Sequence, residues 1–426
     1  MKLRLGDLKR QGQQFARDGQ YLAAVRALVA VIRRLPEDYE ARLTLADALA
    51  SFGAVDVAAR VYAAAATLCI TGGRPLVALV ACRALEDLGR PASGQLTRFS
   101  VLYGRGSNRL ASVGARLNVC DDDRTIDARE LRRGCTVAEL IAEAERIGGE
   151  LATVGELPLK FFPVPLLSEL SPVTLVRVAQ ALRVHRLPAG AVVFRQGDAG
   201  TSCFLLARGK VRILAERGRE VATLTDGAVF GEMALVSGMP RSATVVTGED
   251  TELLELGPEA LAAMGDELSR IAPELDRLAQ RRWMSNLVRQ NPVFQVFSGE
   301  ERQQLLQRFE AIEVPRGAVL IEQSEKPRGL YIVVRGQVAR VRRAPDCAPE
   351  LLERMGAGAM PGLEAIVSDA ISSTSVVAIT PCTVLYLSGR FFRRLAAAVP
   401  EVVQAVRIAT HQVPPPIPGR EISHAC

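Results

Sequence analysis

The stretch from Val229 to Val246 constrains the fold of this chain more than any other feature. It begins as an apolar strand, and Gly231 then allows a sharp turn with no Cβ in the way. Glu232–Leu235 favours a turn of helix, which the residues Ser237–Pro240 interrupt. The β-forming run Thr244–Val246 follows at once. The pattern predicts two strands joined by a short helical corner.

The charges of this stretch predict an anion site beside a hydroxyl site. Unpaired N–H groups at the start of the short helix attract anions. Arg241 adds a guanidinium, which suits a phosphate. Glu232 has a carboxylate that only accepts hydrogen bonds, so beside a phosphate it needs a hydroxyl donor. A 3′,5′-cyclic nucleotide meets both demands on one compact ring.

The stretch resembles the phosphate-binding cassette of cyclic nucleotide-binding domains. That pattern reads Phe-Gly-Glu-x-Ala-Leu-x-x-Gly-x-Pro-Arg-x-Ala-Thr. The residues that fill its defined positions are Phe230, Gly231, Glu232, Ala234, Leu235, Gly238, Pro240, Arg241, Ala243 and Thr244. An ordinary strand-turn-strand corner with a surface arginine is the alternative, and it explains neither the two glycines nor the proline.

The resemblance implies a ligand and its contacts. Glu232 would hold the ribose 2′-hydroxyl, Arg241 the cyclic phosphate, and the backbone of Gly231–Ala234 the other phosphate oxygens. Ser242 after the arginine is compatible with cAMP, yet a hydroxyl there also favours guanine, so cGMP stays open. No cofactor is implied. The ligand-binding residues expected on this basis are Phe230, Gly231, Glu232, Met233, Ala234, Arg241, Ser242 and Ala243.

Composition and targeting signals limit the classes to which this protein can belong. With 426 residues, the chain is long enough for about two to four domains. A net charge of +6 is too mild at this length to indicate nucleic-acid binding. The first ten residues contain no apolar core, so no signal peptide is expected. The longest uncharged run, Val61–Gly73, has 13 residues, whereas a membrane span needs roughly 20, so no span is expected either. The eight cysteines form no Cys-x-x-Cys pair, which predicts reduced thiols, no metal site and a cytoplasmic location.

Residues 1–90 are expected to form helical repeats. Gly12, Gly19 and Ala24 are each followed, 34 residues later, by a small residue at Ala46, Gly53 and Ala58. This period resembles tetratricopeptide repeats, with a looser third unit from Arg74 to Gly89. A generic helical hairpin bundle is the alternative. By the resemblance, the repeats would offer a groove to a protein partner.

Residues 91–160 are expected to be a linker with one or more helices. Thr136 and Glu139 form a capping box that opens a helix to about Ala152. Arg109–Val113 loosely resembles a kinase pseudosubstrate, but it lacks paired arginines and is better interpreted as a polar connector.

The first binding domain is expected over residues 161–290. Short apolar runs with glycine-rich turns predict a β-roll of the jelly-roll kind, preceded by a helix that Ser171 and Pro172 begin. His185 is expected at a strand edge, as a surface residue. Pro258 opens a helical stretch with the only tryptophan, Trp283. In this family an apolar lid often follows the roll, so Trp283 is either a lid over the base or a packing residue between rolls.

A second, degenerate copy is expected over residues 291–400. Gly362 is kept, but Leu363 replaces the glutamate, Asp369 the second glycine, Ile371 the proline and Ser372 the arginine. Without the glutamate and the arginine, this copy lacks both polar groups expected to hold a cyclic nucleotide. It is therefore predicted to be a structural or regulatory domain. The arginines 335, 340, 342 and 343 are expected to form a solvated basic face. The Pro-rich tail, residues 401–426, is too short for a helix-turn-helix domain, so no direct DNA binding is expected.

The expected fold is multidomain α+β: an N-terminal α-helical repeat domain, then two β-roll cyclic nucleotide-binding domains with flanking helices. No kinase glycine loop or nucleophile elbow is present, so we expect no enzyme. The expected function is a cytoplasmic cyclic nucleotide sensor, for which cAMP is the favoured ligand, that relays binding to a protein partner. A regulatory subunit of a kinase-like enzyme and a ligand-independent scaffold are the alternatives.

Overall fold

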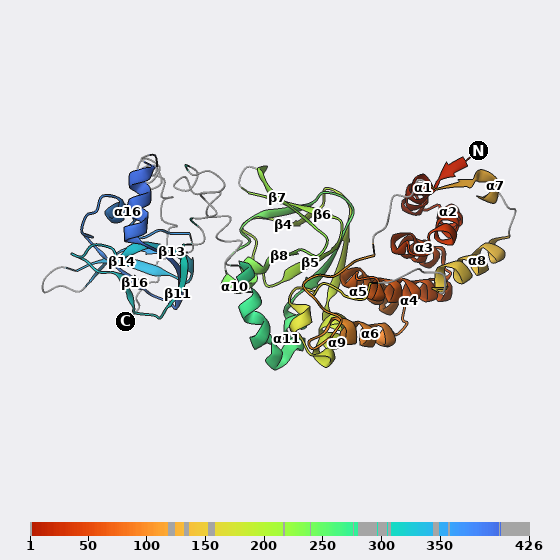
Figure 1. Ribbon diagram of the computed structural model, residues 1–426, viewed down its shortest axis with the longest axis horizontal. Coiled ribbons are helices and arrows are strands. Elements are labelled where there is room, and N and C mark those ends of the chain that lie inside the picture. The colour runs from red at the N-terminus through yellow and green to blue at the C-terminus, as the bar shows by residue number, and fades with distance from the viewer. Residues whose placement is uncertain are drawn as a thin grey trace, which may run out of the picture. The chain divides into compact units, whose positions relative to one another are not determined.

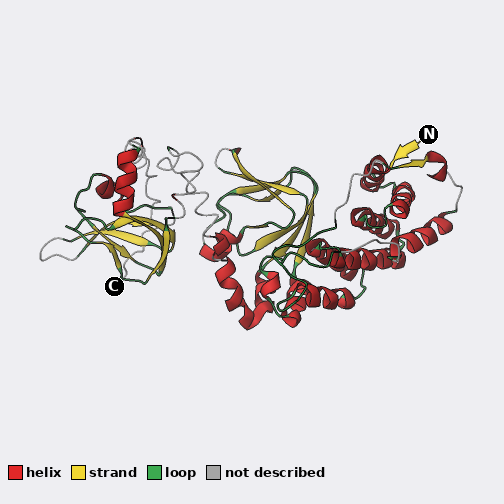
Figure 2. Cartoon of the chain, viewed as in Figure 1, coloured by secondary structure: helices red, strands yellow, loops and turns green. Residues whose placement is uncertain are grey.

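The computed structural model forms two compact units, residues 1–276 and 277–426, and each is described by itself (Figures 1 and 2). The residues that the structure describes are 2–117, 124–131, 136–151, 158–215, 218–238, 240–275, 277–279, 296, 305, 308–343, 349–356, 358–399 and 401.

The first unit begins with a series of helices in which each packs against the next. These are α1 (Leu5–Arg17), α2 (Tyr21–Arg34), α3 (Tyr39–Phe52), α4 (Val55–Thr71), α5 (Pro75–Asp87) and α6 (Ser93–Tyr103). Gly12 of α1 shows why small residues recur, because a Cβ there would lie 2.9 Å from Leu28 Cγ of α2. Gly53 ends α3 in the left-handed conformation, with φ of +97°.

The first two helix pairs repeat at the expected interval. α1 and α3 begin 34 residues apart, at Leu5 and Tyr39, and α2 and α4 do the same, at Tyr21 and Val55. The next pair departs from this interval, since α5 begins at Pro75 and α6 at Ser93. The helical nature of residues 1–90 is confirmed, while their identity as tetratricopeptide repeats stays a prediction.

The segment after α6 returns to the helices. β1 (Lys2–Arg4) pairs antiparallel with β2 (Thr125–Asp127), and α7 (Ala128–Leu131) follows β2. α8 (Val137–Gly149) begins with the predicted capping box, in which Thr136 and Glu139 bond reciprocally. It ends at Gly149, earlier than expected, because Glu150 has an extended backbone.

The first β-roll follows η1 (Leu167–Glu169) and α9 (Pro172–Ala181), where Ser171 caps the helix as predicted. Two four-stranded sheets, in the orders β3-β10-β5-β8 and β4-β9-β6-β7, enclose an apolar core that includes Leu206, Val211 and Leu253. The strands are β3 (Arg183–Leu187), β4 (Val192–Phe194), β5 (Cys203–Arg208), β6 (Lys210–Leu214), β7 (Glu220–Thr225), β8 (Val229–Phe230), β9 (Thr244–Thr247) and β10 (Thr251–Leu256). α10 (Glu232–Ser237) joins β8 to β9, and α11 (Pro258–Met264), η3 (Gly265–Glu267) and helical residues 268–275 follow the roll.

Within this first unit the helices pack directly on the roll. α5 lies on β5 and β10, and α6 lies on α9 (Figure 1). Charged side chains join the two parts, since Arg186 of β3 binds Asp47 of α3 at 3.1 Å and Arg17 of α1 binds Asp250 at 2.5 Å. The helical region and the first roll therefore form one packed body.

The second unit is another β-roll, with sheets in the orders β11-β17-β13 and β12-β16-β14-β15. Its strands are β11 (Glu310–Val314), β12 (Val319–Ile321), β13 (Gly329–Arg335), β14 (Val338–Arg342), β15 (Glu350–Met355), β16 (Ser375–Ala378) and β17 (Cys382–Ser388). α15 (Leu363–Val367) takes the place that α10 has in the first roll, and α16 (Gly389–Ala398) follows the last strand. The expected second copy is confirmed at the level of the fold.

Candidate functional site

The predicted cassette forms a tight corner between β8 and β9. Gly231 has φ of +81°, a conformation that side chains with a Cβ rarely adopt. A Cβ at Gly231 would also lie 2.7 Å from Arg241 Nη1. Glycine is therefore needed here for both the backbone and the space beside the arginine. The turn directs the chain into α10, which begins at Glu232.

Arg241 points into the roll and is only 6% exposed. Its Nη1 donates to the backbone oxygens of Ser202, at 2.8 Å, and Gly231, at 2.7 Å, and its Nη2 donates to Ser202 Oγ at 3.3 Å. The guanidinium carbon lies 4.3 Å from the centre of the Phe194 ring, a cation–π contact. Desolvation lowers the pKa of Arg241, against the opposing effect of nearby acidic groups. The arginine is thus fixed at the corner and is not a surface residue.

The sequence interpretation missed the residues that hold Arg241. Phe194 and Ser202 come from β4 and from just before β5, far from the cassette in sequence. Gly200 lets the backbone pass so close that a Cβ there would collide with Arg241 Nε. A strand-ending phenylalanine gives no signal of this role, because its place beside the guanidinium depends on the pairing of β4 with β9.

The other predicted residues lie around the same corner. Phe230 is 2% exposed and stacks on Phe204, with ring centres 5.4 Å apart. Glu232 is 1% exposed, and Ala234 is also buried. Ser242 is exposed, and its hydroxyl lies 3.6 Å from Met233 Sδ. Ala243, after Ser242, is half-buried and lies directly before β9. The structure therefore brings the eight predicted residues together.

The remaining predicted positions are less central. His185 is half-buried on β3, and its Nε2 lies 2.8 Å from Glu255 Oε2 of β10. Trp283 lies outside the residues that the structure describes. Among the described residues, no group of His, Cys, Asp or Glu is arranged to hold a metal ion. Across the same residues no helix combines the length and apolar character needed to cross a membrane.

The same backbone clamp holds the cassette in both rolls. In the first, Arg241 N donates to Asp198 O at 2.7 Å, and Gly197 N donates to Arg241 O at 2.9 Å. In the second, Ser372 N donates to Glu325 O at 2.8 Å, and Ser324 N donates to Ser372 O at 2.8 Å. Ser372 therefore occupies the position of Arg241, as the sequence predicted.

The corner of the second roll has no comparable polar groups. Leu363, in place of the glutamate, is 4% exposed and packs in the apolar core with Ile366 and Phe392. Ser372 uses its hydroxyl to donate to Thr374 O at 2.7 Å. Asp369 adopts φ of +52°, which its glycine equivalent adopts more easily. The expected acceptor and cation are thus both absent from this described corner.

Several charged side chains of the second roll form ion pairs. Asp369 binds Lys326 at 2.8 Å and Arg393 at 2.9 Å, so it does not add an uncompensated negative charge. Three of the four arginines of the expected basic face also pair with acids. These pairs are Arg340 with Glu353, Arg342 with Glu350, and Arg343 with Glu322.

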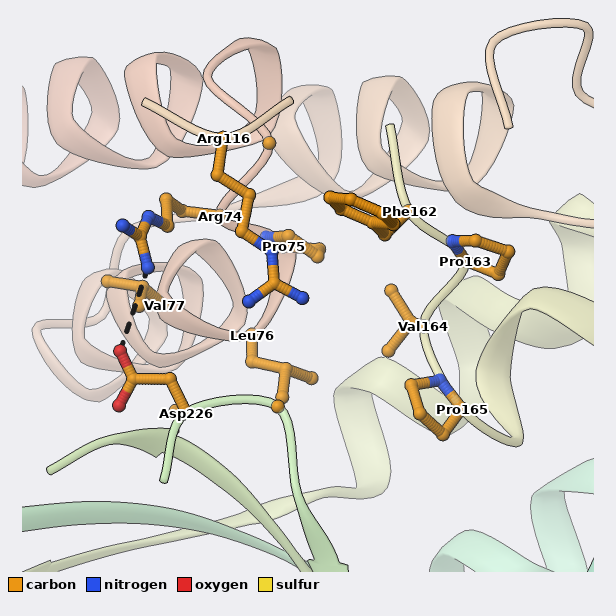
Figure 3. A pocket seen from close by; sticks show the side chains of 13 residues that line it. Arg74, Pro75, Leu76, Val77, Arg116, Phe162, Pro163, Val164, Pro165 and Asp226 are labelled. Atoms are coloured by element: carbon orange, nitrogen blue, oxygen red, sulfur yellow. Dashed lines mark ion pairs between the residues drawn. The ribbon is translucent and has the colours of Figure 1, made fainter. Parts of the chain in front are cut away.

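A separate pocket lies in the first unit, between α5, the segment 162–165 and the turn after β7 (Figure 3). Arg74 and Asp226 approach across it at 3.6 Å, and the Arg116 guanidinium carbon lies 5.3 Å from the Phe162 ring centre. Desolvation raises the pKa of Asp226, while Arg74 acts in the opposite direction. None of the predicted ligand-binding residues lines this pocket.

Comparison with known proteins identifies the two rolls. Residues 184–267 and 311–398 match the family model of the cyclic nucleotide-binding domain. The chain carries two cyclic nucleotide-binding domains in tandem. The first contains the complete cassette around Glu232 and Arg241, and the second contains the degenerate one around Leu363 and Ser372.

Three similar proteins share parts of the chain. One is a cyclic nucleotide-gated potassium channel of Mesorhizobium japonicum, 45% identical over 93 residues, or 22% of this chain and 25% of the channel. Another is a cAMP-dependent protein kinase regulatory subunit of Neurospora crassa, 24% identical over 54% of this chain and 60% of the subunit. A crystal structure of the regulatory domain of Toxoplasma gondii PKA with cAMP is 23% identical, covers 58% of this chain and 92% of that one, and has a TM-score of 0.27. The match to this chain covers less than two thirds of the length of the potassium channel and of the kinase regulatory subunit.

Proposed function

We propose that this protein is a regulatory cyclic nucleotide sensor that binds cAMP in its first cyclic nucleotide-binding domain. The observation that carries the proposal is the corner at Gly231, where the start of α10, the buried Glu232 and the buried Arg241 come together. Its second domain is structural or regulatory, because Leu363 and Ser372 offer neither an acceptor for a ribose hydroxyl nor a cation for a phosphate.

The state of Arg241 supports a phosphate ligand. Its hydrogen-bond acceptors among the described residues are the neutral oxygens of Ser202 and Gly231. Its Nε has no hydrogen-bond partner among those residues. A buried cation with neutral acceptors gains more from a charge-assisted bond, and a bidentate phosphate contact supplies one.

Calorimetric titration of the whole chain with cAMP and cGMP tests the binding proposal. 5′-AMP is the matched control, since it keeps the adenine and the 2′-hydroxyl but not the cyclic phosphate. We expect saturable binding of cAMP, weaker binding of cGMP, and little response to 5′-AMP. Flat titrations with both cyclic nucleotides would overturn the proposal and favour the ligand-independent scaffold.

The second part of the proposal is that binding is relayed to a protein partner through the helical region. The direct packing of α5 on β5 and β10 supports it, because β5 also pairs with β8, the strand that leads into the cassette. We propose a cytoplasmic, non-catalytic protein without direct DNA binding. Similarity to kinase regulatory subunits over about half of the chain favours a kinase-like enzyme as a second candidate partner. Co-purification of a catalytic chain would support that candidate.

A further inference from the structure

The pocket of Figure 3 combines an accessible cation with an apolar lining. Its walls are the first turn of α5, the segment 162–165 and the turn 226–227 after β7, all within the first unit. Leu76, Val164 and Ala207 contribute buried apolar side chains to the lining. The pocket therefore lies where the helical region meets the first β-roll.

Arg116 extends into this pocket from the segment after α6 (Figure 3). Its backbone passes close to Gly73, where φ is +76° and a Cβ would lie 3.2 Å from Arg116 Cα. Its guanidinium carbon lies 5.3 Å from the centre of the Phe162 ring. The same guanidinium lies beside Gly227, because a Cβ there would be 3.5 Å from Arg116 Nη2. Contacts on two sides thus direct this cation into the pocket.

The charge of Arg116 is not balanced by a described acid. Among the described residues, its guanidinium has neither a hydrogen bond nor an ion pair, and its side chain is exposed, so an anion can reach it. Asp226 is engaged elsewhere, since it accepts from Gly209 N at 3.0 Å and faces Arg74 at 3.6 Å. Two arginines and one aspartate line the pocket, which leaves one excess positive charge.

This lining selects an anion that also has an apolar group. The planar guanidinium of Arg116 matches a carboxylate, which can accept two parallel hydrogen bonds. One negative charge balances the excess charge of the pocket, whereas a phosphate monoester carries about −1.5 to −2 at pH 7. The side chains of Leu76, Val164 and Ala207 have no polar atoms, so they favour an alkyl group.

The size of the pocket limits the ligand. Its cavity volume is about 30 Å³. An apolar cavity of about 150 Å³ holds a benzene ring, so this one has room for a short alkyl group only. A purine is larger than benzene, which excludes a cyclic nucleotide as its occupant.

We propose that this pocket binds a short-chain monocarboxylate, with the carboxylate on Arg116 and the alkyl group against Leu76 and Val164. Such a ligand contacts the helical region through α5 and the first roll through the turn 226–227. The site is separate from the cassette at Gly231, whose predicted ligand-binding residues do not line this pocket. The proposal is therefore independent of nucleotide binding.

A chain-length series tests the site in the whole protein. Saturation-transfer NMR without nucleotide, at constant ionic strength, compares acetate, propionate and butyrate. We expect butyrate to bind with a Kd of about 1 mM and affinity to rise about fourfold per added methylene. Butyramide has the same alkyl chain without the charge and should not bind measurably. No saturable binding of butyrate, or equal binding of butyrate and either acetate or butyramide, would overturn the proposal.

Arg116→Gln is the matched variant, because it keeps a polar side chain and removes the charge. It should weaken butyrate binding about tenfold to a hundredfold, the loss expected for hydrogen bonds between charged groups. Arg98→Gln, at an exposed arginine of α6 outside the pocket, should bind butyrate like the parent, and so should Arg241→Ala. Parental affinity in Arg116→Gln, or loss of binding in Arg241→Ala, would overturn the proposal. The chain-length series uses the parent protein, so it stays decisive if a variant fails to fold.

Discussion

The guanidinium of Arg241 stacks on Phe194, and the second domain has lost both members of this pair together. Phe194 pairs with Val245 in the β4–β9 ladder, and Ile321 pairs with Val376 at the equivalent place in the β12–β16 ladder. Ile321 thus stands where Phe194 stands, as Ser372 stands where Arg241 stands. An aliphatic side chain has no π face for a cation, so it suits a corner that no longer contains one.

Arg241→Ala should weaken cAMP binding more than any other single change in the cassette. It removes a charge-assisted contact to the phosphate, which costs about 2–5 kcal/mol, or roughly 30-fold to several thousand-fold in affinity. Glu232→Gln should cost less and act selectively on ligands with a 2′-hydroxyl. Arg195→Ala, at an exposed arginine next to Phe194, is the control. Calorimetry that finds parental affinity in Arg241→Ala would show that the pocket is assigned wrongly.

The whole chain should bind one cyclic nucleotide. The reason is that Leu363 is buried in an apolar core and Ser372 bonds within its own loop, so the second corner offers no polar anchor. Calorimetry of the parent should give a stoichiometry near one, and Arg241→Ala should show no second, residual site. A stoichiometry of two, or saturable high-affinity binding that survives in Arg241→Ala, would contradict this prediction.

The cassette could be predicted because its information is local. Gly231, Glu232 and Arg241 lie within one short stretch, and the turn at Gly231 fixes their relation. The strands of the rolls were predictable for the same reason, from apolar runs between glycine turns.

The contacts of Arg42 and Phe194 could not be predicted in this way. Arg42 meets Ile147 across 105 residues, and an arginine in a helix is usually solvated. Nothing in the local pattern of α3 marks Arg42 as buried. Likewise, Phe194 reaches Arg241 only because β4 and β9 pair. Long-range packing decides both contacts, and a single sequence carries no signal of it.

Glu252→Ala should destabilise the first unit strongly. Glu252 is 6% exposed and lies between Arg208, at 3.3 Å, and Arg186, at 3.5 Å, while Arg186 also binds Asp47 of α3. Removal of the carboxylate leaves Arg208, whose side chain is 28% exposed, without this partner, while Arg186 keeps Asp47, so the expected cost is about 1–3 kcal/mol. Urea unfolding followed by circular dichroism measures the loss.

The control for this change is Glu249→Ala. Glu249 pairs with Lys210 at 3.4 Å, and both side chains are about half exposed. Its loss should cost less than about 1 kcal/mol. Equal unfolding midpoints for the two variants would show that the ion pairs of Glu252 with Arg186 and Arg208 do not stabilise the first unit.

Glu267 should make stability depend on acid pH. Its carboxylate accepts from Ser171 N, Ser171 Oγ and Thr174 Oγ1 at the start of α9. Desolvation raises the pKa of Glu267, but these bonds and the charge of Arg105 outweigh it and lower the pKa to about 2. The stabilisation is therefore complete above the ordinary value of 4.5 and is lost as the pH falls from 4.5 toward 2.

Glu267→Gln should accordingly lower the free energy of unfolding at pH 7 by about 1.5–3 kcal/mol, the range for a hydrogen-bonded charged group. The difference from the parent should shrink as the pH falls below 4.5. Glu259→Gln is the control, because Glu259 pairs with Arg183 at the surface. A difference that stays constant between pH 7 and pH 3 would contradict the low pKa.

Trp283 gives the last prediction, which rests on the sequence, since the residue lies outside the described part of the chain. As the only tryptophan, it is the sole source of indole emission. If it forms a lid, its indole stacks on the base, a contact worth about 1–3 kcal/mol in nucleic-acid complexes. Saturating cAMP should then quench or shift the emission, and Trp283→Ala should weaken binding about tenfold. If it packs between the rolls, the same Trp283→Ala variant should have a lower melting temperature and nearly the parental affinity when folded. Unchanged emission together with unchanged affinity in Trp283→Ala would end the lid hypothesis.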